Sequence, residues 1–379
     1  MPMILNEEQR HLRDTAREFL QEKAPVAALR ELRNNDDSLG YSQALWTEMA
    51  AMGWSGIIIP EEFGGLEFGF AGLGVVLQET GRTLTASPLF ATCVLGASAI
   101  LLAGDQQQKE EVLPGIAAGS VCLALALEES HRHEPLGVRL RAERNGDGYR
   151  LNGAKQFVLD GHSADRLVVV ARSGGEPGSA EGISLFLVDA HAPGISRRRT
   201  SMMDSRNAAR IEFHNVDVPA TALLGSEGEA WPVLEQVLDR GRAGIAAEML
   251  GSAQECFERT TDYLKQRQQF GALIGTFQAL QHRAAQMFID LELLQSVVRD
   301  VCDKVDSASP LLAMVASLAK ARANDTCELI SNEAVQMHGG IGITDQLDIG
   351  LFLKRARVTM QILGDARFHR SRYATLRGF

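Results

Sequence analysis

Arg267 is the residue whose position most favours contact with an anionic ligand. It lies four residues after Tyr263, so the two side chains share one helix face. Phe270 and Gly271 follow and end the helix, which leaves the guanidinium near a helix end, where it can hold two phosphate oxygens at once. Gln278 and Gln281 follow about one turn into the next expected helix. The alternative is a surface arginine that caps free carbonyls at the helix C-terminus.

A glycine-rich stretch supplies the second candidate ligand contact. Gly339, Gly340 and Gly342 follow a helical segment that contains Gln336. Glycines end the helix there and let backbone amides approach a ligand closely. A plain helix C-cap explains the same residues equally well.

Composition excludes several other kinds of site. The chain has 379 residues, with 38 basic against 48 acidic side chains and a net charge of −10, which argues against nucleic-acid binding. The five cysteines never adopt a metal-site or CxxC spacing, so we expect reduced thiols and no metal; they are Cys93, Cys122, Cys256, Cys302 and Cys327. No apolar run reaches the ~18 residues that span a bilayer, and we expect a cytoplasmic protein with no membrane insertion.

Three segments must position these residues. Helical periodicity predicts an N-terminal helical domain over residues 1–118, and short strands without intervening helices predict an antiparallel β-barrel or sandwich over residues 119–225. Helical spacing returns over residues 226–379. We expect a four-helix bundle there, with helices near 229–266, 276–305, 310–338 and 346–373.

Five motifs occur in an order and spacing that resemble the acyl-CoA dehydrogenase family. They are Pro60-Glu-Glu-Phe-Gly-Gly, Gly146-Asp-Gly-Tyr-Arg-Leu-Asn-Gly-Ala-Lys, Asn215-Val-Asp-Val-Pro, Arg267-x-x-Phe-Gly and Gln336-x-x-Gly-Gly-x-Gly. The resemblance covers nearly the whole chain. It implies an α+β multidomain fold of helices, β-barrel and four-helix bundle, which matches the segmentation above.

The resemblance also implies FAD, an acyl-CoA thioester substrate and α,β-desaturation, in which a carboxylate removes the α-proton while the β-hydride moves to the flavin. It implies a tetramer and reoxidation by an electron-transfer flavoprotein. In the family's dimer one subunit supplies the contacts to the flavin ring and the base, and its neighbour holds the diphosphate and adenosine. The neighbour-side contacts expected here are Arg267, Gln269, Phe270, Gln278, Gln336, Gly339 and Gly340.

Both positions at which the family carries its base are glycine in this chain. The usual glutamate position aligns with Gly364, and the position used by a minority of relatives aligns with Gly241. Asp365 is one residue away, as either a substitute base or a capping or ion-paired residue. Glu248 lies on the same face as Gly241 but about two turns away, so no catalytic residue is assigned.

The contacts to the flavin ring are also altered. Glu128 stands where the family has a threonine that bonds the pyrimidine edge of the flavin, and Phe157-Val-Leu replaces the segment whose hydroxyl bonds N5. We expect His131 and His133, which lie nearby, to be exposed loop residues rather than metal ligands.

One interpretation explains all of these departures: the chain is one half of a heteromeric dehydrogenase. Such a chain would complete the FAD site of a paralogous subunit that holds the catalytic glutamate, as in split enzymes for bulky sterol side-chain thioesters. The alternatives are a homotetramer that uses Asp365 or an unrecognised base, a flavoenzyme with altered chemistry, and a non-catalytic structural or binding subunit.

Overall fold

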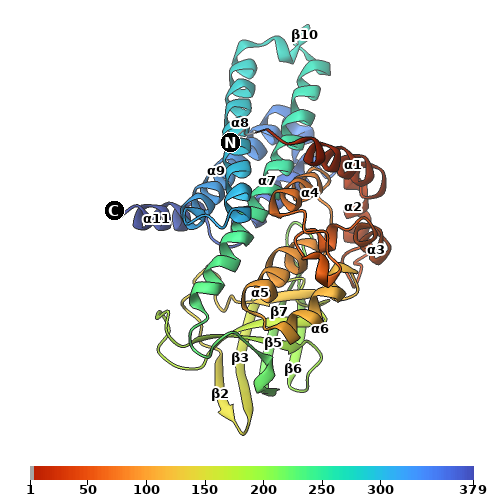
Figure 1. Cartoon of the computed structure of the whole chain (residues 1–379). Coiled ribbons are helices and arrows are strands. Elements are labelled where there is room, and N and C mark those ends of the chain that lie inside the picture. The colour runs from red at the N-terminus through yellow and green to blue at the C-terminus, as the bar shows by residue number, and fades with distance from the viewer. Residues whose placement is uncertain (1–3) are drawn as a thin grey trace. The chain divides into compact units, whose positions relative to one another are not determined.

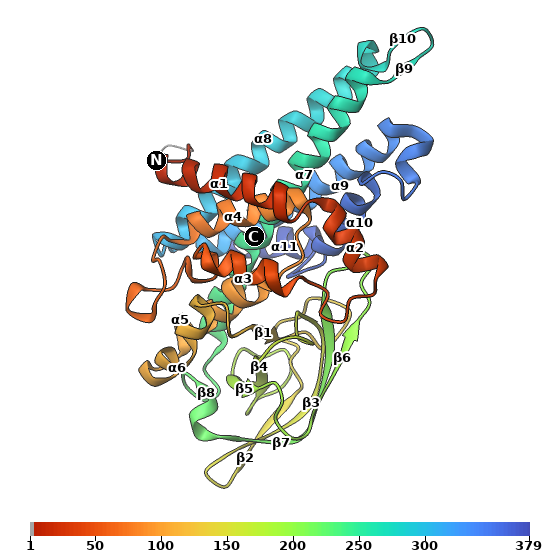
Figure 2. The ribbon, with the colours of Figure 1, turned by 90° about the vertical axis from the view of Figure 1, so that its right-hand side faces the viewer.

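The computed structural model describes residues 4–379 (Figures 1 and 2). The chain divides into two compact units that are each discontinuous in sequence. The helical unit contains the described residues up to Asn35, Phe70–Thr85 and Arg242–Phe379. The mixed unit contains Asp36–Gly69 and Ala86–Gly241.

The helical unit gathers the two ends of the chain. Its helices are α1 (Glu7–Lys23), α2 (Val26–Asn34), α4 (Phe70–Thr83), most of α7 (Trp231–Gln266), α8 (Gln278–Asp306), α9 (Leu312–His338), α10 (Ile349–Thr359) and α11 (Ala366–Leu376). Asn6 and Gln9 form a reciprocal capping box that begins α1. Asp306, at the end of α8, accepts hydrogen bonds from the first two amides of α4, those of Phe70 and Ala71, so α4 is tied to the bundle.

The expectation of a single helix over residues 346–373 is wrong. α10 ends at Thr359 and α11 begins at Ala366, and the turn between them contains Leu363 at φ +57° and Gly364 at φ +110°. Positive φ is incompatible with a right-handed α-helix. The helical unit therefore has the three expected long helices, α7, α8 and α9, and two short ones in place of the fourth.

The mixed unit begins with helices and short turns around two buried tryptophans. Its helical elements are α3 (Gln43–Ala51), the 3₁₀ turns Trp54–Gly56 and Glu61–Phe63, a π-helical segment Phe90–Gly96, α5 (Ala97–Ala103) and α6 (Gln106–Ala117). The Trp46 indole donates to the Gly119 carbonyl, and the Ser55 hydroxyl donates to Ala117. These two bonds tie α3 and the first 3₁₀ turn to the end of α6.

An eight-stranded sheet forms the rest of the mixed unit. The strands are β1 (Leu123–Ala126), β2 (Arg141–Asn145), β3 (Gly148–Leu159), β4 (Arg166–Arg172), β5 (Ile183–Asp189), β6 (Ile195–Thr200), β7 (Ala208–Pro219) and β8 (Leu223–Leu224). Their order is β6-β7-β3-β2-β4-β5-β8, with β1 paired to β4. Most pairs are antiparallel, as expected, but β1–β4 and β2–β4 are parallel. β4 is buried along nearly its whole length, which is typical of a central strand.

All five cysteines are buried and free. Across residues 4–379, no group of three or more His, Cys, Asp or Glu side chains is placed to hold a metal ion. No described helix is both long and apolar enough to cross a bilayer.

Candidate functional site

Arg267 lies where α7 ends, as its sequence context predicts. Its backbone amide still bonds the Tyr263 carbonyl, at 2.9 Å, and the chain then turns through a short hairpin of β9 (Gln268–Gln269) and β10 (Ala272–Leu273). Phe270 and Gly271 form the turn with φ of +58° and +75°. The guanidinium of Arg267 is exposed and has no hydrogen bond or ion pair with any described residue. Phe270 is 93% exposed, so an aromatic ring and a cation are both available at this tip.

The glycine-rich stretch follows the end of α9. Gly339 caps the helix at φ +67°, and a 3₁₀ turn continues to Ile343. A Cβ added at Gly339 or Gly340 would meet no atom within 4 Å. Packing against other atoms therefore does not require these two glycines, although the positive φ of Gly339 favours glycine there, and the open backbone leaves space for a ligand to approach.

A stacked ring pair joins the ends of α7 and α9. The rings of Tyr263 and His338 have centroids 4.3 Å apart, and the tyrosine hydroxyl donates to the His338 carbonyl at 3.4 Å. His338 in turn bonds the Ala334 carbonyl through Nδ1, and burial lowers its pKa. The ring stack and the hydroxyl–carbonyl contact place the start of the glycine-rich stretch beside the last turn of α7.

The remaining side-chain amides expected to contact a cofactor lie at the start of α8, at the end of α9 and in the β9–β10 hairpin. Gln278 is the first residue of α8, and Gln336 lies in the last turn of α9. Arg283 pairs with Glu333, which ties the start of α8 to that turn of α9. The side chains of Gln278 and Gln336 make no hydrogen bond to the described chain, whereas the Gln269 amide donates to the neighbouring Gln268 carbonyl.

These features fit the diphosphate and adenosine end of a dinucleotide. A guanidinium without a protein partner suits paired phosphate oxygens. The glycine backbone is open, and the exposed ring of Phe270 offers an aromatic face. We use the name cofactor-tail residues for those that are expected to contact the diphosphate and adenosine of FAD: Arg267, Gln269, Phe270, Gln278, Gln336, Gly339 and Gly340.

In the turn at Gly364, in contrast, neighbouring side chains leave no space for a Cβ atom. A Cβ at this position would lie 2.6 Å from Cδ1 of Phe368 and 2.8 Å from Nε2 of His369. The Leu363 carbonyl accepts a hydrogen bond from His369 Nε2 at 2.9 Å. Position 364 therefore has neither the backbone conformation nor the space for a carboxylate side chain.

Lys320 on α9 holds the same turn from the other side, and sequence reasoning missed it. Its ammonium is fully buried and donates to Asn324 Oδ1, Met360 O and Gly364 O at 2.6, 3.3 and 3.1 Å. Burial lowers the pKa of Lys320 to about 7. Its only signal in the sequence is a lysine on a helix face of small residues that also carries Ser317 and Asn324, since a buried lysine is rare unless the charge has partners.

The carboxylates near Gly241 and Gly364, the two positions aligned with the family's catalytic base, already have partners within the chain. Asp365 is the N-cap of α11 and accepts from the Phe368 amide at 2.7 Å, so the capping alternative holds for this residue. Glu248 forms a buried ion pair with Arg355 at 3.2 Å. Arg242, which follows Gly241, lies over the ring of Phe368.

Near the position expected for the flavin ring, Glu128 pairs with a histidine. The separation of Glu128 Oε1 and His133 Nδ1 is 2.5 Å, and the His133 side chain is 4% exposed. The expectation of an exposed His133 is wrong, because the carboxylate draws the ring inward; His131 is exposed as expected. A carboxylate that is paired with an imidazole cannot donate a hydrogen bond to the flavin, as a threonine hydroxyl would.

The segment that should meet flavin N5 is built on a β-bulge. Phe157 has φ +50°, and the register of β3 against β7 shifts between Lys155 and Val158. Val158 is buried, while Phe157 is 41% exposed. The Lys155 ammonium is buried against Glu129 Oε1 at 2.6 Å, and burial lowers its pKa. This segment thus offers aliphatic and aromatic surface at the place where the resemblance implies a hydroxyl.

Comparisons with known proteins identify the family. Models of the acyl-CoA dehydrogenase N-terminal, middle and C-terminal domains match residues 6–120, 122–216 and 228–375. An acyl-CoA dehydrogenase of Bacillus subtilis (strain 168) is 30% identical over 363 residues, covering 94% of each chain. The structure of butyryl-CoA dehydrogenase from Megasphaera elsdenii superposes with a TM-score of 0.92 at 27% identity, covering 100% of each chain.

A third similar structure is a glycine-to-alanine variant of the Tcur3481–Tcur3483 steroid acyl-CoA dehydrogenase, with a TM-score of 0.88 at 32% identity and 98% of each chain covered. The three domain models, the identity over almost the full length and the shared fold lead to one conclusion. The chain belongs to the acyl-CoA dehydrogenase family of oxidoreductases.

Proposed function

We propose that this chain is one half of a heteromeric acyl-CoA dehydrogenase that desaturates a CoA thioester between Cα and Cβ. It completes the FAD site of a paralogous subunit, which contributes the contacts to the flavin ring and the catalytic carboxylate. Reoxidation proceeds through an electron-transfer flavoprotein.

One contrast supports this proposal. The side chains of Arg267, Gln278 and Gln336 make no hydrogen bond to the described chain and the backbone at Gly339 and Gly340 is open, whereas the turn at Gly364 has no space for a Cβ atom. A chain that worked alone would need both halves of the site. The comparison with the Tcur3481–Tcur3483 steroid enzyme adds support, since the name of that relative pairs two designations, Tcur3481 and Tcur3483.

The residues of this chain bind and orient the cofactor. Arg267 neutralises and aligns the diphosphate, the amides around Gly339 and Gly340 approach it, and Phe270 packs against the adenosine end. Bound FAD supplies the hydride acceptor of the desaturation. A thioester α-proton is only weakly acidic, so a positioned base and a polarised carbonyl are needed, and both come from the partner.

The test is the flavin content of the purified protein, alone and after co-expression with a paralogue from a neighbouring gene. We expect little FAD on the chain alone and one FAD per pair of chains in the complex. Arg267→Ala in this chain should lower the FAD content of the complex, whereas Arg357→Ala, at an exposed ion pair on α10, should not.

Other outcomes support the alternatives. Full flavin loading with desaturation by the chain alone supports a self-sufficient homotetramer, and Asp365→Ala then tests Asp365 as the base. Full loading with a different product supports altered chemistry. A complex whose flavin content does not depend on this chain supports a structural subunit.

A further inference from the structure

Three residues on one face of α7 lie along the same stretch of chain. Arg259, Tyr263 and Arg267 are spaced four residues apart, so their side chains follow one another on that face. Tyr263 stacks on His338, where the glycine-rich stretch begins. Arg259 pairs with Asp348 at 2.8 Å, where α10 begins. One face of α7 thus contacts both ends of the segment 339–347, which begins with the glycine-rich stretch.

This segment depends on its two ends for its position. Of residues 339–347 only Gly342 is buried, and most of the others are exposed. Its hydrogen bonds are local, since the amide and the hydroxyl of Thr344 both donate to the Ile341 carbonyl, at 3.1 and 2.7 Å. A segment with few buried contacts opens at a low free energy. The contacts at its ends therefore decide where it lies relative to α7.

Two helices hold the far end of the segment through carboxylates. Asp348 accepts from Arg259 Nη1 of α7 on one oxygen, at 2.8 Å, and from Arg30 Nε of α2 on the other, at 2.9 Å. Asp345, inside the segment, pairs with Arg30 at 3.1 Å and with Arg33 at 2.7 Å. The Asp348 side chain is 26% exposed, so its two ion pairs are partly shielded from water.

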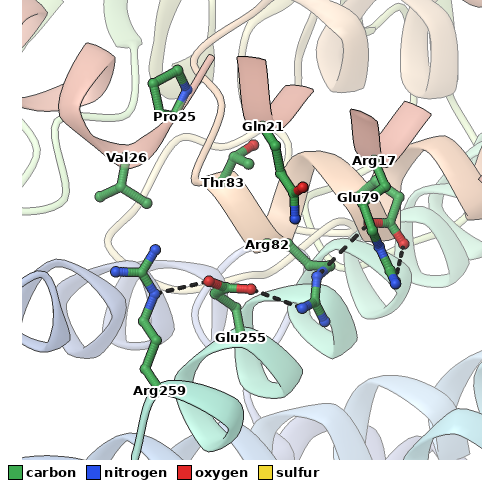
Figure 3. Close-up of a pocket in the computed structure, with 9 residues that line it drawn as sticks. All are labelled: Arg17, Gln21, Pro25, Val26, Glu79, Arg82, Thr83, Glu255 and Arg259. Atoms are coloured by element: carbon green, nitrogen blue, oxygen red, sulfur yellow. Dashed lines mark hydrogen bonds and ion pairs between the residues drawn. The ribbon is translucent and has the colours of Figure 1, made fainter. Parts of the chain in front are cut away.

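A row of alternating ion pairs holds Arg259 in turn (Figure 3). Arg259 Nε donates to Glu255 at 2.8 Å, and the other oxygen of Glu255 pairs with Arg82 of α4, also at 2.8 Å. Glu79 follows Arg82, and Arg17 of α1 ends the row. Because Arg259 has a carboxylate on each side, its guanidinium is fixed toward the end of the segment. Arg17, at the opposite end of the row, pairs with Glu79 instead.

We propose that Arg259 is a positioning residue for the cofactor: through Asp348 it holds the glycine-rich stretch beside Arg267. Arg30 supports the same carboxylate from α2. The inference rests on the proposed function, since it takes the glycine-rich stretch to contact FAD. A ligand that binds a fixed segment loses less conformational entropy than one that must order it, so loosening this end weakens the binding of FAD.

Arg259→Gln and Arg17→Gln form a matched pair of variants. Each removes a guanidinium that is 38% exposed and bonded to a glutamate of the same row, and each keeps the buried Arg82. Hydrogen exchange of the full chain, in whichever assembly it purifies, reports on residues 339–351, where the Thr344 and Leu351 amides are bonded. We expect exchange there to be about fivefold faster in Arg259→Gln and unchanged in Arg17→Gln.

The affinity of the heteromeric complex for FAD is the second measurement. Arg259→Gln and Asp348→Asn should each raise the dissociation constant of FAD about fivefold and leave kcat of the flavin-loaded complex unchanged, because they loosen the cofactor's tail and not its ring. Arg17→Gln should bind FAD as the native chain does.

Each outcome has one meaning. The inference is overturned if Arg259→Gln and Arg17→Gln exchange alike over residues 339–351, or if they bind FAD equally well while Arg267→Ala binds it more weakly. If Arg267→Ala also leaves FAD binding unchanged, the proposed function fails, and the exchange of residues 339–351 still decides whether Arg259 holds the segment.

Discussion

Glycine at position 364 removes a side chain and also permits a backbone conformation that other residues strain to adopt. Its φ is +110°, and a Cβ would fall 2.6 Å from the Phe368 ring. We predict that Gly364→Ala lowers the free energy of unfolding by about 2–5 kcal/mol, the sum of backbone strain and overpacking. Urea unfolding of the two proteins measures the difference.

Gly350→Ala is the control for that substitution. Gly350 lies in α10, has helical backbone and would place its Cβ in open space. Alanine there should leave stability unchanged or raise it slightly, by up to about 1 kcal/mol. Equal stability of Gly364→Ala and Gly350→Ala would contradict the closed turn and reopen position 364 as a site for a base.

Single residues also show what sequence alone reveals. The aspartate after Gly364 is recognisable as an N-cap, because capping depends on local sequence. The pairing of Glu128 with His133 is not recognisable in this way, since nothing local distinguishes a buried histidine from an exposed loop histidine. The contacts of Gly364 are equally hidden, because Lys320 approaches from a different helix.

Secondary-structure elements also divide into features that local sequence predicts and features that depend on distant contacts. The ends of α7 and α9 match their predicted positions, because Phe270–Gly271 and Gly339 are local stop signals. The break between α10 and α11 was missed, because apolar spacing continues through it and the positive φ of Leu363 is stabilised by a bond from His369. Parallel pairing of β1 with β4 was also missed, since strand periodicity carries no information on direction.

Lys320 on α9 donates hydrogen bonds to the turn between α10 and α11. Its lowered pKa predicts that the free energy of unfolding depends on pH. Burial lowers its pKa from 10.5 to about 7. Between those values the unfolded chain binds one proton more than the folded chain, so raising the pH favours the folded state. Relative to Lys320→Met, the native chain should gain stability between pH 7 and pH 8.5, with a slope that approaches about 1.4 kcal/mol per pH unit.

Urea unfolding at three pH values in that window measures the slope. Lys265→Met is the matched control, because Lys265 is exposed and its removal should leave the slope of the native chain unchanged. A stability difference between native chain and Lys320→Met that stays constant with pH would show that Lys320 remains charged throughout, held by its three acceptors.

For the whole molecule, periodicity reveals the order of helices, strands and helices, but not which segments pack together. Phe70–Thr85 folds with residues 242–379, although 34 residues that join the mixed unit separate it from the first helices. That grouping depends on long-range contacts such as Asp306 to the first amides of α4. The local sequence does predict that the cofactor-tail residues lie near helix ends, at the end of α7, the start of α8 and the end of α9.

If FAD bridges two chains, its removal must weaken their association. Binding of the cofactor and binding of the partner are then linked, and each strengthens the other by the same factor. We predict that stripping FAD from the heteromeric complex raises the dissociation constant of the two chains at least tenfold, and that Arg267→Ala in this chain does so without stripping. Mass photometry over a concentration series measures the constant, with Arg357→Ala as control. A dissociation constant that is the same with and without FAD would mean that each flavin contacts one chain only, and the division of the site between two chains would have to be abandoned.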